Sequence, residues 1–138
     1  GGSMAAQHGW AYRAQPRRLV VFALDGKQQL AAMPPPTFAK PLKAPEFTVY
    51  EELAERGSHV WSQSCGMCHG PAGTAGGYAP DLRASAVMLD EKALHSVVFE
   101  GALKARGMPQ FKNINKDDLE AVRHYIRREA RKSNLATP

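Results

Sequence analysis

The sequence predicts a mainly α-helical domain of three or more helices, preceded by an N-terminal β-strand or hairpin and a proline-rich extension. Three observations lead to this prediction. Apolar residues recur at helical spacing in three stretches after residue 47, five prolines lie within residues 33–45, and an apolar run at residues 18–24 ends in a turn signal. With 138 residues, 43% of them hydrophobic, the chain has room for one domain with a modest core.

The first 32 residues are expected to contain a strand pair. Residues 1–4 (Gly-Gly-Ser-Met) look like a cloning remnant before an internal start, so any export signal has been lost. Residues 18–24 are β-branched and apolar, Asp25-Gly26 predicts a turn, and residues 27–30 can return as a second strand. Both faces of the first strand are apolar, which favours a strand that belongs to a larger sheet.

Residues 33–46 are too rich in proline to form a helix and should run extended as a linker. Two arrangements are open. The segment can lie on the domain as a belt, held by Phe38 and Leu42, or it can be a solvated tether.

Three helices are predicted between residues 47 and 132, with residues 133–138 as a frayed tail. The first begins at the capping box Thr48-Val49-Tyr50-Glu51 and leads through Gly57 and Trp61 into a cysteine motif. The second follows the cap Asp90 and stops at Gly101, and the third follows the cap Asn115. The third helix has acidic residues in its first turn, and its last turns hold basic residues that suit the negative end of the helix dipole: Arg127, Arg128, Arg131 and Lys132. Its buried stripe is Leu119, Val122, Tyr125 and Ile126.

The only two cysteines form the motif Cys65-Gly66-Met67-Cys68-His69, the C-x-x-C-H signature of covalent haem attachment. Each thiol can add to one vinyl group of haem c, and the adjacent histidine can bind the iron. Three other interpretations are a thioredoxin-like redox pair, half of a zinc site and a structural disulfide. A redox pair should lie between a strand and a helix, whereas this motif ends a helix, and no second ligand pair is present for zinc.

These residues resemble a known family. A helix ending in Cys-x-x-Cys-His, a loop with Pro80-Asp81-Leu82 and a later Gly107-Met108-Pro109-Gln110-Phe111 before a closing helix are similar to a class I cytochrome c, over residues 47–132. The N-terminal residues 9–12 and 15–26 are similar to the propeller exit of type II quinohaemoprotein alcohol dehydrogenases. Those are periplasmic enzymes with a pyrroloquinoline quinone (PQQ) propeller, a proline-rich linker and a C-terminal cytochrome domain. Residues 5–32 would then be a remnant of the propeller.

The resemblance implies roles for several residues. Met108 would be the second axial ligand, whereas Met88 is expected to pack in the core, and Met4, Met33 and Met67 are poor candidates. The carbonyl of Pro80 would accept the ring N–H of His69. Arg83 would bind a haem propionate, or else be solvated. Trp61, with Gly57, would cross Tyr125 of the last helix. The remaining helix histidines are expected to be solvated: His59, His95 and His124.

The expected function is one-electron transfer, with no bond made or broken by this chain. Electrons would come from reduced PQQ in the absent propeller and go to an acidic redox carrier, such as a blue-copper protein or a cytochrome, because the net charge is +5. The alternatives are a free-standing periplasmic shuttle and an open-site haem sensor or peroxidase. The basic residues are dispersed, which disfavours nucleic acid, and no apolar run is long enough to span a membrane.

Overall fold

The computed structural model describes residues 8, 12–13, 18–32, 37–75, 77 and 79–136. Its α-helices are α2 (Glu51–Ser64), α3 (Gly66–His69), α4 (Glu91–His95) and α5 (Lys116–Ala136). A π-helical turn, η4 (Ser96–Glu100), continues α4, and four 3-10 turns connect the helices: η1 (Pro71–Gly73), η2 (Leu82–Ala84), η3 (Ala86–Leu89) and η5 (Lys104–Arg106). The mainly α prediction is confirmed. No helix in the described part of the chain is long and apolar enough to cross a membrane.

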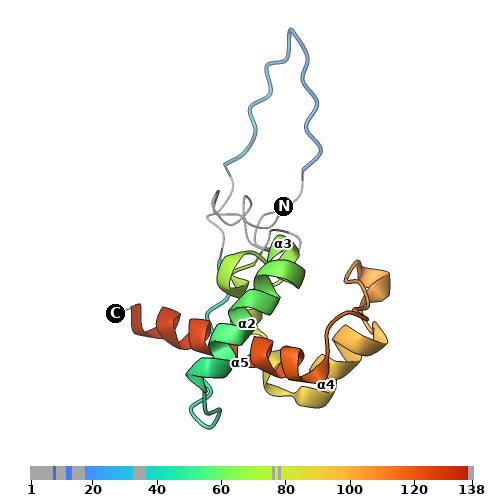
Figure 1. Ribbon diagram of the computed structural model, residues 1–138. Coiled ribbons are helices and arrows are strands. Elements are labelled where there is room, and N and C mark those ends of the chain that lie inside the picture. The colour runs from blue at the N-terminus through green and yellow to red at the C-terminus, as the bar shows by residue number, and fades with distance from the viewer. Residues whose placement is uncertain are drawn as a thin grey trace.

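Helices α2 and α5 cross closely and form the centre of the fold (Figure 1). Gly57 makes this approach possible, because a Cβ atom at that position would lie 2.0 Å from the carbonyl oxygen of Ala121. One turn further along α2, the rings of Trp61 and Tyr125 are 5.9 Å apart. The predicted crossed-helix contact is therefore present.

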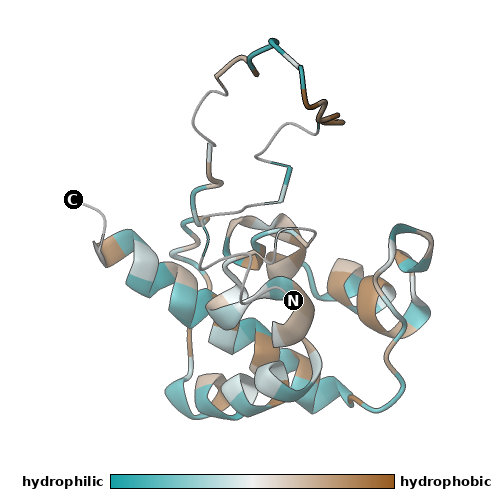
Figure 2. Cartoon of the chain, turned by 90° about the horizontal axis from the view of Figure 1, so that it is seen from above, coloured by the Kyte–Doolittle hydropathy of each residue, from teal (hydrophilic) through white to brown (hydrophobic). Residues whose placement is uncertain are grey.

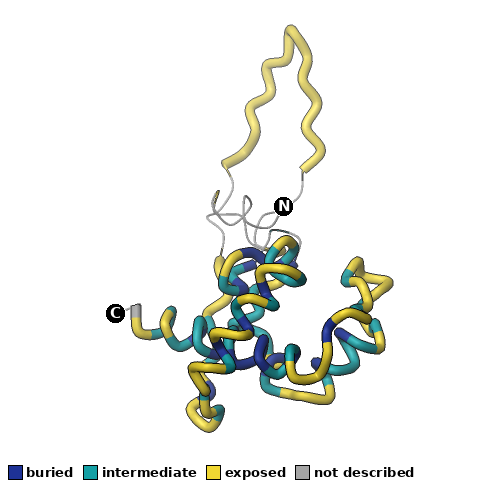
Figure 3. The backbone as a smooth tube through the Cα atoms, in the orientation of Figure 1, coloured by how far each residue is buried: buried dark blue, intermediate teal, exposed yellow. Residues whose placement is uncertain are grey.

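The core joins this crossing to the α4 segment, and buried stretches are dark blue in Figure 3. Its members are Trp61, Met88, Leu94, Val98, Ile114, Leu119, Val122 and Ile126. They come from α2, η3, α4, η4 and α5, and Ile114 lies two residues before α5, so one apolar cluster joins most of the elements.

Two of the three predicted helix starts are confirmed. The side chain of Asp90 accepts the N–H of Ala93, and that of Asn115 accepts the N–H of Asp118. The predicted capping box at Thr48 is wrong, because α2 begins at Glu51 with Tyr50 as its N-cap and no side-chain cap from Tyr50 itself. The backbone N–H of Tyr50 donates instead to Nδ1 of His124 on α5. Gly101 ends the second helical segment in the left-handed conformation, as expected.

Helix α5 continues to Ala136, so residues 133–136 belong to it and the predicted frayed tail is too long. Its arginines consequently lie within the helix, not at the dipole end. Arg127 is only 1% exposed and donates to the carbonyl oxygens of Leu42 and Arg83, and Arg131 donates to that of Phe47. Charged side chains are buried here because extended backbone supplies acceptors.

The same contacts show where the linker begins to pack against the helical domain as a belt. Ala44 is buried, and the N–H of Leu42 donates to the carbonyl oxygen of Arg83 at 2.9 Å. Phe38, one of the two anchors considered for a belt, is 53% exposed. The belt therefore begins at about residue 41, and residues 37–40 remain exposed.

Residues 18–32 form an extended arm that runs away from the helices and returns (Figures 1 and 2). The predicted turn is present, with the Gly26 N–H donating to the Ala23 carbonyl oxygen at 3.1 Å. The predicted strand pair is not formed in these residues, and Leu19, Phe22 and Leu24 are almost fully exposed. Two strands without a third strand or a helical face to cover them are marginal. The structure does not describe residues 1–4, which include Met4, or Met33.

Candidate haem-attachment site

The cysteine motif follows α2 directly and forms a separate short helical turn. Cys65 caps α2 and donates its N–H to the carbonyl oxygen of Trp61 at 2.9 Å. Its own carbonyl oxygen accepts the N–H groups of Cys68 and His69, at 3.2 and 3.0 Å, which closes α3. Both cysteines are free thiols. The turn thus brings two thiols and one imidazole together at the end of one helix.

His69 is 8% exposed, and its Nδ1 lies 3.3 Å from the carbonyl oxygen of Pro80. A carbonyl can only accept, so Nδ1 carries the proton and Nε2 keeps its lone pair, the arrangement of a metal-ligating histidine. Trp61 lies beside the imidazole, with ring centroids 6.0 Å apart, and donates its Nε1–H to the carbonyl oxygen of Gly70 at 3.1 Å. The expected contact of Pro80 with His69 is present.

The protonation of the site favours haem over the other interpretations of the motif. Burial, with a smaller contribution from the nearby Cys68, raises the pKa of the Cys65 thiol to about 11. A redox-active pair needs a thiol with a lowered pKa, so a thioredoxin-like role does not fit. Burial also lowers the pKa of His69, partly offset by the contact with Pro80, and the neutral imidazole is the form that binds a metal.

Zinc and a disulfide fit less well than haem. Among the described residues, no group of three or more Cys, His, Asp or Glu side chains is placed to hold a metal ion. The two cysteines are not bonded to each other. Two free thiols beside a buried histidine with an available Nε2 are the donor set that a covalent haem requires, so the residues present fit this group.

Met108 and Met88 lie in different environments. Met108 follows Gly107, which has φ +91° and ends η5, and precedes a proline, so its side chain comes from an irregular loop; it is partly buried against the core cluster. Met88 is 1% exposed within the cluster itself, in the short turn η3. Met67, between the cysteines, is 77% exposed. These placements agree with the expected packing role of Met88.

Arg83 is neither solvated nor unpartnered. Its guanidinium contacts both carboxylate oxygens of Asp81 and, through Nη1, the hydroxyl of Ser133. Sequence reasoning missed Asp81 as this partner, although an aspartate that caps a turn two residues before an arginine is a local signal that can be found. It also missed Ser133, for which no local signal exists because the two residues lie 50 positions apart.

Of the three histidines expected to be solvated, one is exposed, one is half-buried and one is buried. His59 is exposed. His95 is half-buried, with Nδ1 3.5 Å from Glu100, and its ring contacts Phe99 edge to face. His124 is 4% exposed and is covered by Phe47 and Tyr50, so the prediction was wrong there. Helix α5 is covered on several sides, which the single apolar stripe in the sequence does not show.

Comparisons with known proteins match the part of the chain that contains the cysteine motif. The family model described as cytochrome c oxidase, cbb3-type, subunit III, matches residues 52–126. The chain is 39% identical over 111 residues to quinohemoprotein alcohol dehydrogenase ADH IIB of Pseudomonas putida, covering 79% of this chain and 16% of that protein. It is 39% identical over 118 residues to lupanine 17-hydroxylase [cytochrome c] of a Pseudomonas species, covering 83% of this chain and 16% of that protein.

A third relative is the dehydrogenase subunit of the alcohol dehydrogenase (quinone) of Acetobacter aceti, 32% identical over 130 residues. The match covers 94% of this chain and 17% of that protein. The chain therefore spans only 16–17% of the length of these three relatives.

Proposed function

This chain belongs to the cytochrome c family described by subunit III of the cbb3-type oxidases, and we propose that it carries single electrons from a PQQ-dependent dehydrogenase to an external redox carrier. A domain of this family binds haem c covalently and is an electron-transfer module, not a catalytic one. Haem iron supplies a one-electron Fe(III)/Fe(II) couple. The observation that carries the proposal is the buried His69, with Nδ1 facing the Pro80 carbonyl and Nε2 available, beside two free thiols.

The residues of the site have distinct proposed roles. Cys65 and Cys68 would hold the haem through thioether bonds, and His69, oriented by Pro80, would bind the iron. Met108 would supply the second protein ligand to the iron; its loop is irregular and its side chain is neither fully buried nor fully exposed, which supports this role. Trp61 and Tyr125 form the wall beside His69. With His69 and Met108 both bound to it, the iron would offer no place for a substrate, which favours electron transfer over the sensor and peroxidase alternatives.

The donor is proposed from the relatives. Two of the three are named as alcohol dehydrogenases of the quinone or quinohaemoprotein kind, and each is about six times as long as the part that this chain matches. We assign residues 5–32 to the end of an upstream PQQ propeller, residues 33–46 to the linker and residues 47–132 to the cytochrome domain, in the bacterial periplasm. The exposed apolar arm at residues 18–32 supports this division, because apolar strand sequences are usually covered.

The acceptor is proposed to be acidic, from how the charge is distributed. Residues 1–46 hold six Lys or Arg and two Asp or Glu, whereas residues 47–138 hold 12 and 11, so most of the net charge lies outside the cytochrome domain. Within that domain, residues 101–116 hold four basic residues and no acidic one. The four are exposed and flank the Met108 loop: Lys104, Arg106, Lys112 and Lys116. An acidic carrier would be steered toward this basic loop.

Electron transfer is tested by mixing the oxidised haem-loaded chain with a PQQ-loaded propeller domain and a primary alcohol, and following the haem absorbance. We expect reduction only when alcohol and propeller are both present. Alcohol-dependent reduction by the chain alone would contradict the assignment of catalysis to the upstream domain. A chain that stays oxidised with both present, yet is reduced by dithionite, would remove the proposed donor.

The Met108 ligand is tested by substituting the two methionines separately. The oxidised protein should show a weak near-infrared sulfur-to-iron band that disappears in Met108→Ala and persists in Met88→Leu. Met108→Ala should also lower the midpoint potential and allow carbon monoxide to bind. The opposite pattern would assign the ligand to Met88.

The basic loop is tested by reversing charges at Lys104, Arg106 and Lys112 together, with the same triple reversal at Lys27, Lys40 and Lys43 as a control of equal net charge. At low ionic strength we expect the loop variant to slow reduction of an acidic blue-copper protein at least tenfold, and the control to slow it less than twofold. The difference should shrink as salt is added. Equal effects of the two triple variants would show that only net charge matters.

A further inference from the structure

The segment that supplies the Pro80 carbonyl is held by an ion pair between the next residues. The carboxylate of Asp81 accepts the backbone N–H of Arg83 at 2.9 Å, its Nε–H at 3.0 Å and its Nη2–H at 2.7 Å. The side chain of Arg83 is 17% exposed and that of Asp81 is 11% exposed, so the pair is largely shielded from water. A two-point contact of this kind fixes geometry as well as charge.

Arg83 also connects this turn to two other parts of the molecule. Its Nη1–H donates to the hydroxyl of Ser133 on α5 at 2.7 Å. Its carbonyl oxygen accepts the N–H of Leu42 at 2.9 Å, and Nη1 of Arg127 lies 3.4 Å from the same oxygen. Through one residue, η2 is tied both to α5 and to the belt of the linker.

The position of the Pro80 carbonyl depends on this arrangement. The carbonyl of Pro80 and the N–H of Asp81 belong to one planar peptide unit, so the oxygen turns when Asp81 turns. The contact from His69 Nδ1 to this oxygen is 3.3 Å, already at the long end for a hydrogen bond. A small rotation at Asp81 is therefore enough to break it.

We propose that Arg83 is a positioning residue for His69, acting through Asp81 and the Pro80 carbonyl and not by binding a haem propionate. The role rests on the proposed ligation of haem by His69. A histidine that donates its second N–H to a fixed carbonyl is a stronger ligand and favours the ferric state. Loosening the turn weakens this ligand and raises the midpoint potential.

The experiment compares Arg83→Met with Arg56→Met in the haem-loaded chain. Arg56 also forms an ion pair with an aspartate, Asp118, at 2.7 Å, but on the surface between α2 and α5 and through one carboxylate oxygen. Two quantities are measured: the midpoint potential, and the exchange rate of the His69 ring N–H with solvent in the reduced, diamagnetic protein by NMR. We expect Arg83→Met to raise the potential and speed exchange at least tenfold, and Arg56→Met to change neither.

Two further variants keep the test decisive. Ser133→Ala removes one anchor of Arg83 and should speed exchange at least twofold, and it decides the question if Arg83→Met fails to fold. Arg83→Lys keeps the charge and one contact to Asp81, and should fall between the unsubstituted protein and Arg83→Met. A propionate partner would instead change the potential while leaving the ring N–H exchange unchanged.

The outcomes separate the two proposals. Unchanged exchange in Arg83→Met or, failing that, in Ser133→Ala, with an intact haem spectrum, overturns the positioning role alone. A spectrum of the unsubstituted protein without an axial histidine overturns the proposed function itself.

Discussion

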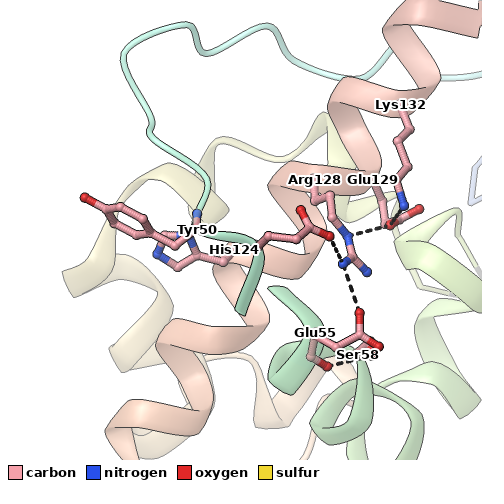
Figure 4. Close-up of polar contacts among 8 residues, drawn as sticks. Tyr50, Glu55, Ser58, His124, Arg128, Glu129 and Lys132 are labelled. Atoms are coloured by element: carbon pink, nitrogen blue, oxygen red, sulfur yellow. Dashed lines mark hydrogen bonds and ion pairs between the residues drawn. The ribbon is translucent and has the colours of Figure 1, made fainter. Parts of the chain in front are cut away.

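Nδ1 of His124 accepts the backbone N–H of Tyr50 at 3.1 Å, so a side chain of α5 satisfies the first turn of α2 (Figure 4). Nε2 of the same ring lies 3.3 Å from a carboxylate oxygen of Glu120. Nδ1 must therefore carry no proton to accept this hydrogen bond, and the Nε2–H of the neutral imidazole faces the carboxylate. This ring therefore adds a polar contact between α5 and the start of α2, beside the Arg56–Asp118 ion pair and the close crossing at Gly57.

Stability should fall in mild acid because of His124. Burial lowers its pKa below the ordinary 6.5, Glu120 opposes that shift and Arg123 adds to it. Below pH 6.5 the unfolded chain binds this proton more readily than the folded chain, so the contribution is complete above that pH and is lost as the pH falls through the lower folded-state pKa. Urea unfolding of the haem-loaded chain at about pH 7.5 and about pH 5 measures the difference.

His124→Asn is the matched variant, because its amide oxygen can replace Nδ1 as the acceptor and does not titrate. It should flatten the pH dependence, whereas His59→Asn, at an exposed position, should leave it unchanged. An equal pH dependence in all three proteins would show that His124 is not the group responsible.

Truncations should locate the start of the folded unit. Deleting residues 5–30 should leave the haem spectrum and the midpoint potential nearly unchanged, because residues 18–30 of the arm are exposed. Deleting residues 5–46 removes the carbonyl of Leu42 that the buried Arg127 uses, and should cost roughly 3 kcal/mol of unfolding free energy. Thermal unfolding of the two truncated proteins checks this; similar losses from both would mean that the arm is part of the fold.

Gly57 should tolerate no side chain. The Cβ of an alanine would meet the backbone of Ala121 at 2.0 Å, so Gly57→Ala must push α2 and α5 apart, at a cost of about 3 kcal/mol, the upper end of typical overpacking. Haem incorporation should fall with stability. Ser62→Ala, on the exposed side of the same helix, should change the free energy of unfolding by about 0.5 kcal/mol at most. A Gly57→Ala protein as stable as Ser62→Ala would contradict the crossing geometry.

Local patterns predicted the parts of the fold that depend on local physics. The caps Asp90 and Asn115 each bond to an N–H three residues later, and the stop at Gly101 needs only a positive φ. The contact of His69 with Pro80 was expected from the family resemblance. These signals lie within short stretches of sequence.

The features that sequence missed depend on distant residues. Thr48 is a good capping residue, but α2 starts later because His124, 74 positions away from Tyr50, takes the role. Arg127 seemed to belong to a helix end, yet it is buried because the linker supplies a carbonyl 85 positions away. The arm at residues 18–32 has strand-forming residues but nothing to pair with among the described residues. In each case the partner, not the residue, decides the structure.

The most direct test of the central claim is a spectroelectrochemical titration of the haem-loaded chain, performed once under argon and once under carbon monoxide. A closed one-electron carrier predicts a single one-electron transition at the same midpoint potential under both gases, because the proposed ligands His69 and Met108 would leave no free position on the iron. A midpoint potential that rises under carbon monoxide, with a changed spectrum of the reduced protein, would show an open iron and contradict the assignment of this chain as an electron-transfer module.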